Sequence, residues 1–236
     1  MTPLSFRMLP WCLAAPMLLG AAGCSGLLPA PTPLPSFYTL DGAQTAIEGD
    51  AVGKPAVAHA RSDAPTLVVH PPHATAGFDS RRIVYTREPH RLAYFAHSEW
   101  VDTPSRMLAP LIVAAVVQGG SLHAVVPTPS AAAADISLDT EIVRLQHDFS
   151  GTPSRVRLTL RATLVDSATR KVLASREFDE TVDSASEDAR GGVIAAHRAV
   201  RLLLEKVSAL CSEAAVAWHA SEFRRLQSIS GTANAP

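Results

Sequence analysis

Residues 154–166 have the sequence SRVRLTLRATLVD, and this stretch decides the fold. Every second side chain is apolar, and those between are mostly arginine or threonine. Such alternation is typical of a β-strand with one face against a core and the other in water. The apolar set is Val156, Leu158, Leu160, Ala162 and Leu164, and the polar set is Arg155, Arg157, Thr159, Arg161 and Thr163. The pattern predicts a strand of a half-buried, antiparallel sheet.

Two further long strands flank this one. Residues 135–149 alternate similarly but change phase after Ile142, which predicts a β-bulge. Residues 171–182 supply the third strand, and the connections at 150–153 and 166–170 are short enough for hairpins. We therefore expect a three-strand meander.

Two helices accompany the sheet. The first begins at Pro104, behind the candidate cap Thr103, and ends at the pair 119–120; Pro110 should kink it or move its start later. The second is a long amphipathic helix over about 186–225.

Shorter strands are expected at 37–40, 66–70, 82–86, 91–97 and 122–126. Together these elements predict an α+β fold in a single domain, with a mostly antiparallel sheet covered on one face by two helices.

Residues 1–23 resemble a signal peptide. Arg7 precedes an apolar stretch at 8–19, which is too short to span a bilayer, and small residues follow at 20–23. We expect this segment to be removed on export.

The sequence Ala21-Ala22-Gly23-Cys24 resembles the lipobox of bacterial lipoproteins, which usually has leucine where this chain has Ala21. The resemblance implies covalent N-acyl and S-diacylglycerol chains on Cys24, enough lipid for stable anchoring. Ser25, in place of aspartate, points to the periplasmic face of the outer membrane. An ordinary secretory signal whose cleavage site abuts a cysteine is the alternative.

The mature chain divides into three parts. Residues 24–36 contain four prolines and form an extended tether. Residues 37–225 form the folded domain, in which 43–65 is expected to be a mobile insertion, and 226–236 is expected to be a disordered tail.

The charge and the cysteine content argue against nucleic-acid binding, an intramolecular disulfide and a cysteine nucleophile. The 236 residues carry a formal charge of -1, without the concentrated basic surface that nucleic acid requires. With Cys12 removed and Cys24 acylated, Cys211 is left alone, so no intramolecular disulfide can form. Cys211 falls on the apolar stripe of the last helix, which favours a small buried hydrophobe over a nucleophile.

The sequence contains no recognisable catalytic motif and no metal-binding motif. His70 and His73 bracket two prolines, and zinc needs more ligands than this pair supplies. His197 lies on an apolar stripe, which favours a hydrogen-bonded core histidine. We therefore expect no enzyme activity, no catalytic residues and no metal or other cofactor.

The arginines of the opening strand have two interpretations. Arg155, Arg157 and Arg161 are either a solvated strand face that discourages edge pairing or a docking surface for an acidic partner or lipid headgroups.

Several short motifs occur along the chain, and their order is more specific than any one of them. They are the lipobox, the proline-rich tether, Ser-Phe-Tyr-Thr-Leu at 36–40, Leu-Val-Val at 67–69, Arg-Arg-Ile-Val-Tyr-Thr at 81–86 and Ser-Glu-Trp at 98–100. This order resembles the auxiliary lipoproteins of ABC-type transport systems, in the group that includes paraquat-inducible protein C. The resemblance covers roughly residues 24–218, with departures at 43–65 and 70–75.

The resemblance implies a non-enzymatic subunit of an intermembrane lipid-transport system. Its partners would be a mammalian-cell-entry-type periplasmic protein, an ABC ATPase and a permease, and a homo-oligomeric ring is compatible with it. Trp100 matches the family's tryptophan position and would lie in the core or at a subunit contact. The alternative is an autonomous periplasmic lipid-binding lipoprotein, which requires an apolar pocket between sheet and helices.

Overall fold

The computed structural model describes residues 34–41 and 64–232, and from Pro35 onward they form one compact unit. The expected signal peptide, Cys24 and nearly all of the expected tether and insertion lie outside the described residues. Within them the fold is α+β, with one sheet and two helices, as the sequence predicts.

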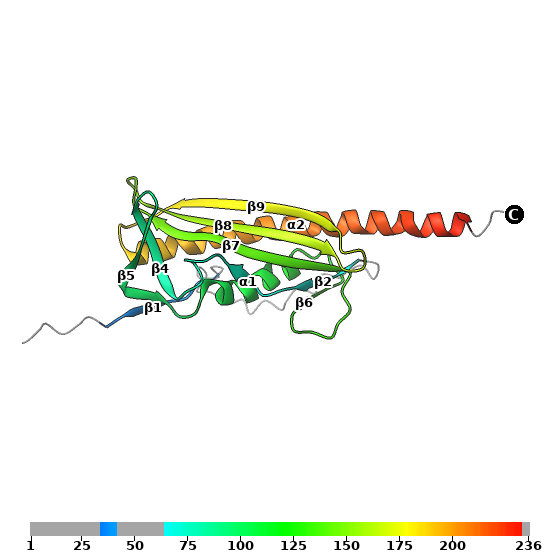
Figure 1. The fold of residues 1–236 in the computed structure, drawn as a ribbon, viewed down its shortest axis with the longest axis horizontal. Helices are drawn as coiled ribbons and strands as arrows, with labels where there is room; N and C mark the ends of the chain where they lie inside the picture. The colour runs from blue at the N-terminus through cyan, green and yellow to red at the C-terminus, as the bar shows by residue number, and fades with distance from the viewer. Residues whose placement is uncertain (1–33, 42–63, 233–236) are drawn as a thin grey trace, which may run out of the picture. The chain divides into compact units, whose positions relative to one another are not determined.

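Three long antiparallel strands form the main part of the sheet (Figure 1). They are β7 (Ile136–Asp148), β8 (Arg155–Asp166) and β9 (Val172–Asp183). β8 lies between the other two, and its register against β7 runs from Asp166 opposite Ile136 to Arg155 opposite Asp148. The predicted meander and its two hairpins are confirmed, and the alternating apolar side chains of β8 are buried.

The second edge of β7 pairs in turn with three short strands that run parallel to it. These are β2 (Thr66–Val69), β3 (His73–Ala74) and β4 (Arg82–Glu88). Beyond them lie β6 (Ala124–Pro127), parallel to β2; β5 (Arg91–Trp100), antiparallel to β4; and β1 (Ser36–Tyr38), parallel to β5. The long pairs are antiparallel, as predicted, whereas the sequence did not indicate the short parallel pairs.

A β-bulge interrupts β7 between Ile142 and Arg144, where its register against β8 shifts. After the bulge, Leu145 and His147 face the core, whereas without the extra residue they would point to the open face. The Thr75 hydroxyl donates a hydrogen bond to the Val143 carbonyl at 2.9 Å, which satisfies a backbone acceptor at the bulge. The predicted change of phase is confirmed.

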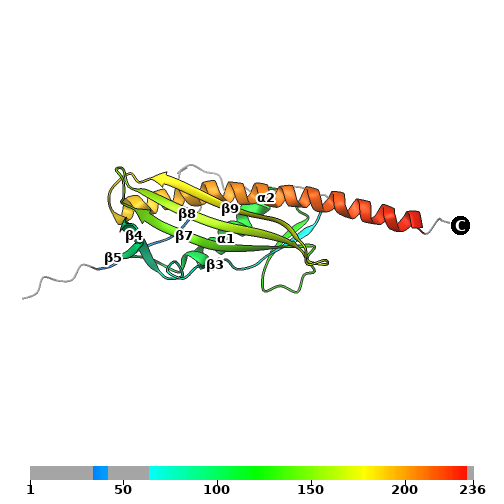
Figure 2. The ribbon, with the colours of Figure 1, turned by 45° about the horizontal axis from the view of Figure 1, so that its top comes forward.

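The helices α1 (Pro104–Gln118) and α2 (Ala189–Thr232) cover one face of the sheet (Figure 2). α1 begins at Pro104 despite Pro110 in its interior, so its start is not moved later. Thr103 occupies the N-cap position, but its hydroxyl contacts the Ser105 hydroxyl at 3.2 Å instead of accepting from a backbone N–H. Neither described helix has the length and apolar composition needed to cross a membrane.

α2 closes the core. Its buried stripe contains Val193, Ala196, Val200, Leu203, Leu204, Val207, Cys211 and Ala214. Trp100 is 3% exposed in the same core, which confirms the core interpretation. We expected a helix end near 225 and a disordered tail over 226–236, whereas α2 continues to Thr232. Adding residues to an existing helix is favourable without an apolar pattern, because the cost of nucleation has already been met.

Polar contacts fix the start of α2 to the β7–β8 hairpin. The Asp188 carboxylate accepts a hydrogen bond from the Gly191 N–H at 2.7 Å and thereby caps the helix. The preceding Glu187 accepts from the Ser154 N–H at 2.9 Å. These bonds link the first turn of α2 to the end of the sheet.

A buried histidine lies against the same turn. His147 is 2% exposed, and its Nε2 lies 2.8 Å from the Ser154 hydroxyl. A Cβ atom on Gly192 would lie 2.4 Å from the His147 Nδ1. Because a carbon atom does not fit at this distance, the ring and the helix can approach this closely only with glycine at 192.

We expect Gly192→Ala to destabilise the protein by about 1–3 kcal/mol, because the added methyl group overpacks against the imidazole. Urea unfolding measures this change. In a His147→Ala background the substitution should cost much less, since the ring is gone and alanine gains about 1 kcal/mol of helix propensity over glycine. An equal cost in both backgrounds would contradict the contact.

We expect the free energy of unfolding to decrease as the pH is lowered, because His147 titrates. Burial lowers its pKa below the ordinary 6.5, although Glu187, Asp188 and Asp148 partly oppose this. The unfolded chain therefore binds a proton at a pH where the folded chain does not. The contribution of the neutral His147 to stability is complete above pH 6.5 and is lost as the pH falls through the lowered pKa.

The measurement is the urea midpoint from about pH 7.5 to about pH 5, compared between wild type and His147→Gln. The substitution should flatten the decline, whereas the exposed control His123→Gln should retain it. Parallel declines in wild type and His147→Gln would disprove the role of this histidine.

Candidate functional site

The sheet face opposite the helices is polar along β7, β8 and β9, and all three candidate arginines lie on it. It carries the arginines Arg144, Arg155, Arg157 and Arg161, and the carboxylates Asp139, Glu141, Asp148, Glu177, Asp179 and Asp183. We call this set the polar sheet face. Carboxylates outnumber arginines on it, so its net charge is negative.

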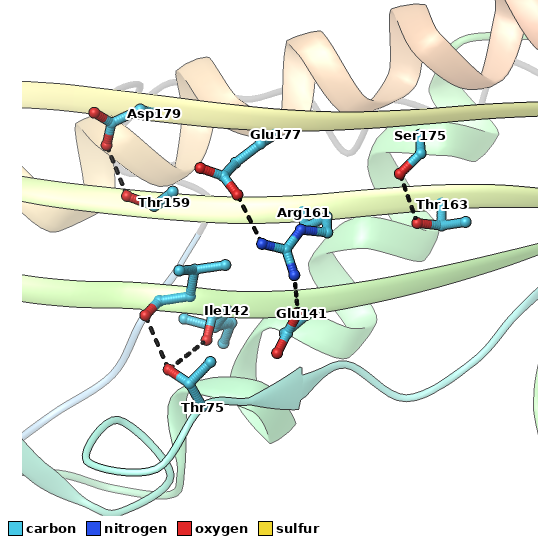
Figure 3. A network of polar contacts seen from close by, with 10 residues as sticks. Thr75, Glu141, Ile142, Thr159, Arg161, Thr163, Ser175, Glu177 and Asp179 are labelled. Atoms are coloured by element: carbon cyan, nitrogen blue, oxygen red, sulfur yellow. Dashed lines mark hydrogen bonds and ion pairs between the residues drawn. The ribbon is translucent and has the colours of Figure 1, made fainter.

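Arg161 lies at the centre of the polar sheet face (Figure 3). Its register neighbours are Glu141 on β7 and Glu177 on β9. One guanidinium nitrogen donates to Glu141 at 2.7 Å and another donates to Glu177 at 2.9 Å. The single positive charge therefore lies between two negative charges on a side chain that is about half exposed.

Arg157 is paired as well. Its guanidinium donates to the Asp179 carboxylate at 3.0 Å, and the Thr159 hydroxyl donates to the same carboxylate at 2.7 Å. Partial burial raises the pKa of Asp179, but these hydrogen bonds outweigh burial, so the pKa is lowered overall. Asp179 therefore stays ionised beside Arg157 at neutral pH.

Arg155 differs, because its exposed guanidinium makes no ion pair among the residues that the structure describes. Its register neighbours are Asp148 and Asp183. Partial burial raises the pKa of Asp148, but hydrogen bonds from Ser150 and the charge of Arg155 outweigh this and lower it. Arg155 thus acts on Asp148 through its charge and without an ion pair.

The polar sheet face therefore presents both signs of charge in a fixed pattern. Smaller polar contacts extend it: the hydroxyls of Thr163 and Ser175 lie 3.1 Å apart, and His70 Nδ1 lies 2.8 Å from an Asp139 oxygen. Exposed ion pairs contribute only about 0–1 kcal/mol each to stability, so the pattern matters more for surface recognition than for folding.

The histidines that the structure describes are not part of a group that could hold a metal ion. His197 is half-buried and donates a hydrogen bond from Nε2 to the Thr39 carbonyl at 3.0 Å, so the predicted hydrogen bond exists at the edge of the core. Across residues 34–41 and 64–223, no three His, Cys, Asp or Glu side chains group closely enough to hold a metal ion.

Two nucleophile candidates are packed in the interior. Burial raises the pKa of the Cys211 thiol to about 12, as expected for a small hydrophobe. The Ser154–His147 pair was not identified from the sequence, although the phase change in β7 places His147 among the core-facing residues. Ser154 is 0% exposed, so a substrate cannot reach its hydroxyl in this conformation.

A groove of about 730 Å³ lies between α1 and α2. Leu111, Ala115 and Leu204 line it with apolar surface, and Asp41, Arg201 and Glu205 add charge. It lies between the helices, whereas the lipid-carrier hypothesis expected a pocket between helices and sheet.

Solved structures share this fold. Protein XCC0632 from Xanthomonas campestris, of the family DUF330, is 24% identical with a TM-score of 0.59, covering 64% of this chain and 85% of its own. An uncharacterized protein of known crystal structure is 12% identical with a TM-score of 0.57, covering 76% of this chain and 100% of its own. No curated protein matches the sequence.

At the level of sequence, residues 50–208 match the family described as the ABC-type transport auxiliary lipoprotein component. The match includes the three long strands, α1 and most of the buried stripe of α2. This chain therefore belongs to the family of ABC-type transport auxiliary lipoproteins.

Proposed function

We propose that the protein is an outer-membrane lipoprotein subunit of an intermembrane lipid-transport system. It would dock a periplasm-spanning protein of the mammalian-cell-entry type, which works with an ABC ATPase and a permease. The observation that carries this proposal is the family match over 50–208, and the lipobox at 21–24 agrees with it.

The anchor and its reach follow from the sequence. Acyl chains on Cys24 would hold the protein at the membrane. Ser36, the first residue of β1, lies twelve positions after Cys24, and an extended chain of that length spans about 40 Å. The folded domain would therefore stay within about 40 Å of the lipid surface, on the periplasmic side.

The polar sheet face is the proposed docking surface. The two helices cover the opposite face and bury its apolar side chains, whereas this face is left to solvent or to a partner. Because Arg157 and Arg161 are already paired with carboxylates, the matching partner surface would carry both signs of charge in a complementary pattern. Arg155 supplies the free positive charge among the three candidates.

The proposed role is non-enzymatic. Ser154, His147 and Cys211, which could have supplied a nucleophile, are buried. On the open polar sheet face, Arg157 and Arg161 are held in ion pairs. Binding and positioning are the tasks that such a surface performs well.

Autonomous lipid binding is the second candidate, and the groove between α1 and α2 favours it. The groove has the volume of a small-molecule site and an apolar floor, yet it is open and bordered by charges. We rank it below docking, because the family describes an auxiliary component of a transport system.

Replacing Cys24 by alanine should release the protein from the outer-membrane fraction, because the acyl attachment site is lost. Fractionation and mass spectrometry of the N-terminal peptide measure this. The matched control is Cys211→Ala, which removes the other cysteine of the mature chain and should keep the wild-type location.

Affinity purification of the acylated wild type should recover the mammalian-cell-entry-type protein and its ATPase. An acylated, correctly located protein that recovers neither would refute docking.

Arg161→Glu should weaken recovery of that partner, because it places three carboxylates side by side at the centre of the polar sheet face. Like charges on neighbouring strands cost only about 0.2–1 kcal/mol, so the domain should remain folded, which a thermal melt verifies. The control is Arg201→Glu, an exposed, ion-paired arginine on α2. Equal recovery by both variants would remove the polar sheet face as the docking site.

A further inference from the structure

An exposed stripe of aromatic, aliphatic and cationic side chains crosses the sheet at the β1 edge. Its members are Phe37, Arg81, Arg82, Leu92 and Tyr94, and we call it the edge stripe. Phe37 is 53% exposed, Leu92 43% and Tyr94 38%.

The strand register brings these residues together. Phe37 on β1 and Arg82 on β4 both lie opposite Glu99 of β5, so they share one face of the sheet. Tyr94 lies opposite Val84, two residues along β4 from Arg82 and beyond a shift in the register between Arg82 and Val84. β1 covers only the last three residues of β5, which leaves Leu92 and Tyr94 on a strand without an outer neighbour among the described residues.

Cation–π contacts hold the arginines over the rings. The Arg82 guanidinium carbon lies 4.9 Å from the centroid of the Tyr94 ring, and that of Arg81 lies 5.6 Å from the centroid of Phe37. Arg81 also donates to the Trp100 carbonyl at 3.2 Å, which fixes its position. Both arginines are exposed.

This combination suits the headgroup layer of a bilayer. Aromatic rings with a polar partner sit at the level of the headgroups, and arginine carries its charge to lipid phosphates while its stem stays in apolar surroundings. The half-buried Glu99 lies between Phe37 and Arg82 and offsets one of the two positive charges.

The short segment between Cys24 and Phe37 would keep the edge stripe close to a membrane. Phe37 follows the first residue of β1, within about 40 Å of an acylated Cys24 along an extended chain. A weak lipid-binding surface held so near a bilayer meets it at high effective concentration, so modest affinity is sufficient.

We infer that the edge stripe rests on the headgroup layer of the bilayer that holds Cys24 and sets the orientation of the domain relative to the membrane. This inference rests on the proposed acylation of Cys24. The ligand is the anionic phosphate of phospholipid headgroups, contacted by Arg81 and Arg82, while Phe37, Leu92 and Tyr94 enter the interface.

The test uses the full acylated lipoprotein in vesicles of phosphatidylethanolamine and phosphatidylglycerol. An environment-sensitive fluorophore is attached at Leu92→Cys or at the control Val172→Cys. Val172 is 60% exposed and begins β9, on the opposite edge of the sheet. Cys211 is buried and Cys24 would be acylated, so the introduced cysteine is labelled selectively.

Bromine-carrying lipids should quench the fluorophore at 92 more than about twofold more strongly than at 172, since interfacial side chains reach about 5–10 Å into the headgroup boundary. Arg82→Glu should reduce the quenching at 92 while the protein still floats with the vesicles. Equal quenching at both positions, with flotation intact, would overturn the inference and leave the anchor standing.

Two further outcomes are decisive. Loss of flotation by every form would refute the lipid anchor, and the inference would fall with it. A signal at 92 that disappears when the protein is diluted over more vesicles would show a contact between copies of this chain, which also overturns the inference.

Discussion

The two edges of β7 constrain the whole domain. One edge pairs continuously with β8, while the other holds β2, β3 and β4 one after another, all parallel to it. Each short strand depends on β7 for its hydrogen bonds, and β6, β5 and β1 depend on those strands in turn. The bulge after Ile142 keeps both halves of β7 apolar on the core side. Without this central strand, β1 and β6 lose the series of hydrogen-bonded strands that joins them to β8 and β9.

The two faces of the sheet differ in composition and in what they contribute to the protein. On the helix side, burial of aliphatic side chains stabilises the fold. On the opposite side, arginines and carboxylates alternate between neighbouring strands, so that a broad surface stays hydrated and each arginine has carboxylates nearby. Arg161 shows how register produces this, because its two partners come from different strands at the same level of the sheet.

Local periodicity predicted the elements that depend on local sequence. The alternation in β8, the phase change at Ile142 and the start of α1 at Pro104 all follow from side-chain pattern and backbone restriction. The parallel pairing of β2, β3 and β4 with β7 depends on contacts far apart in sequence, which periodicity does not encode. The same holds for the site: the sequence identified Arg157 and Arg161, but their neutralisation depends on Glu141, Glu177 and Asp179 on neighbouring strands.

The position of α2 in the chain has a consequence for folding order. The helix that covers the apolar sides of β8 and β9 is the last element of the described sequence, so the sheet cannot be covered until synthesis has passed about residue 214. Until then a large apolar surface with open strand edges is exposed, a state prone to aggregation. A chain built in this order benefits from a chaperone that holds the sheet until its final helix arrives.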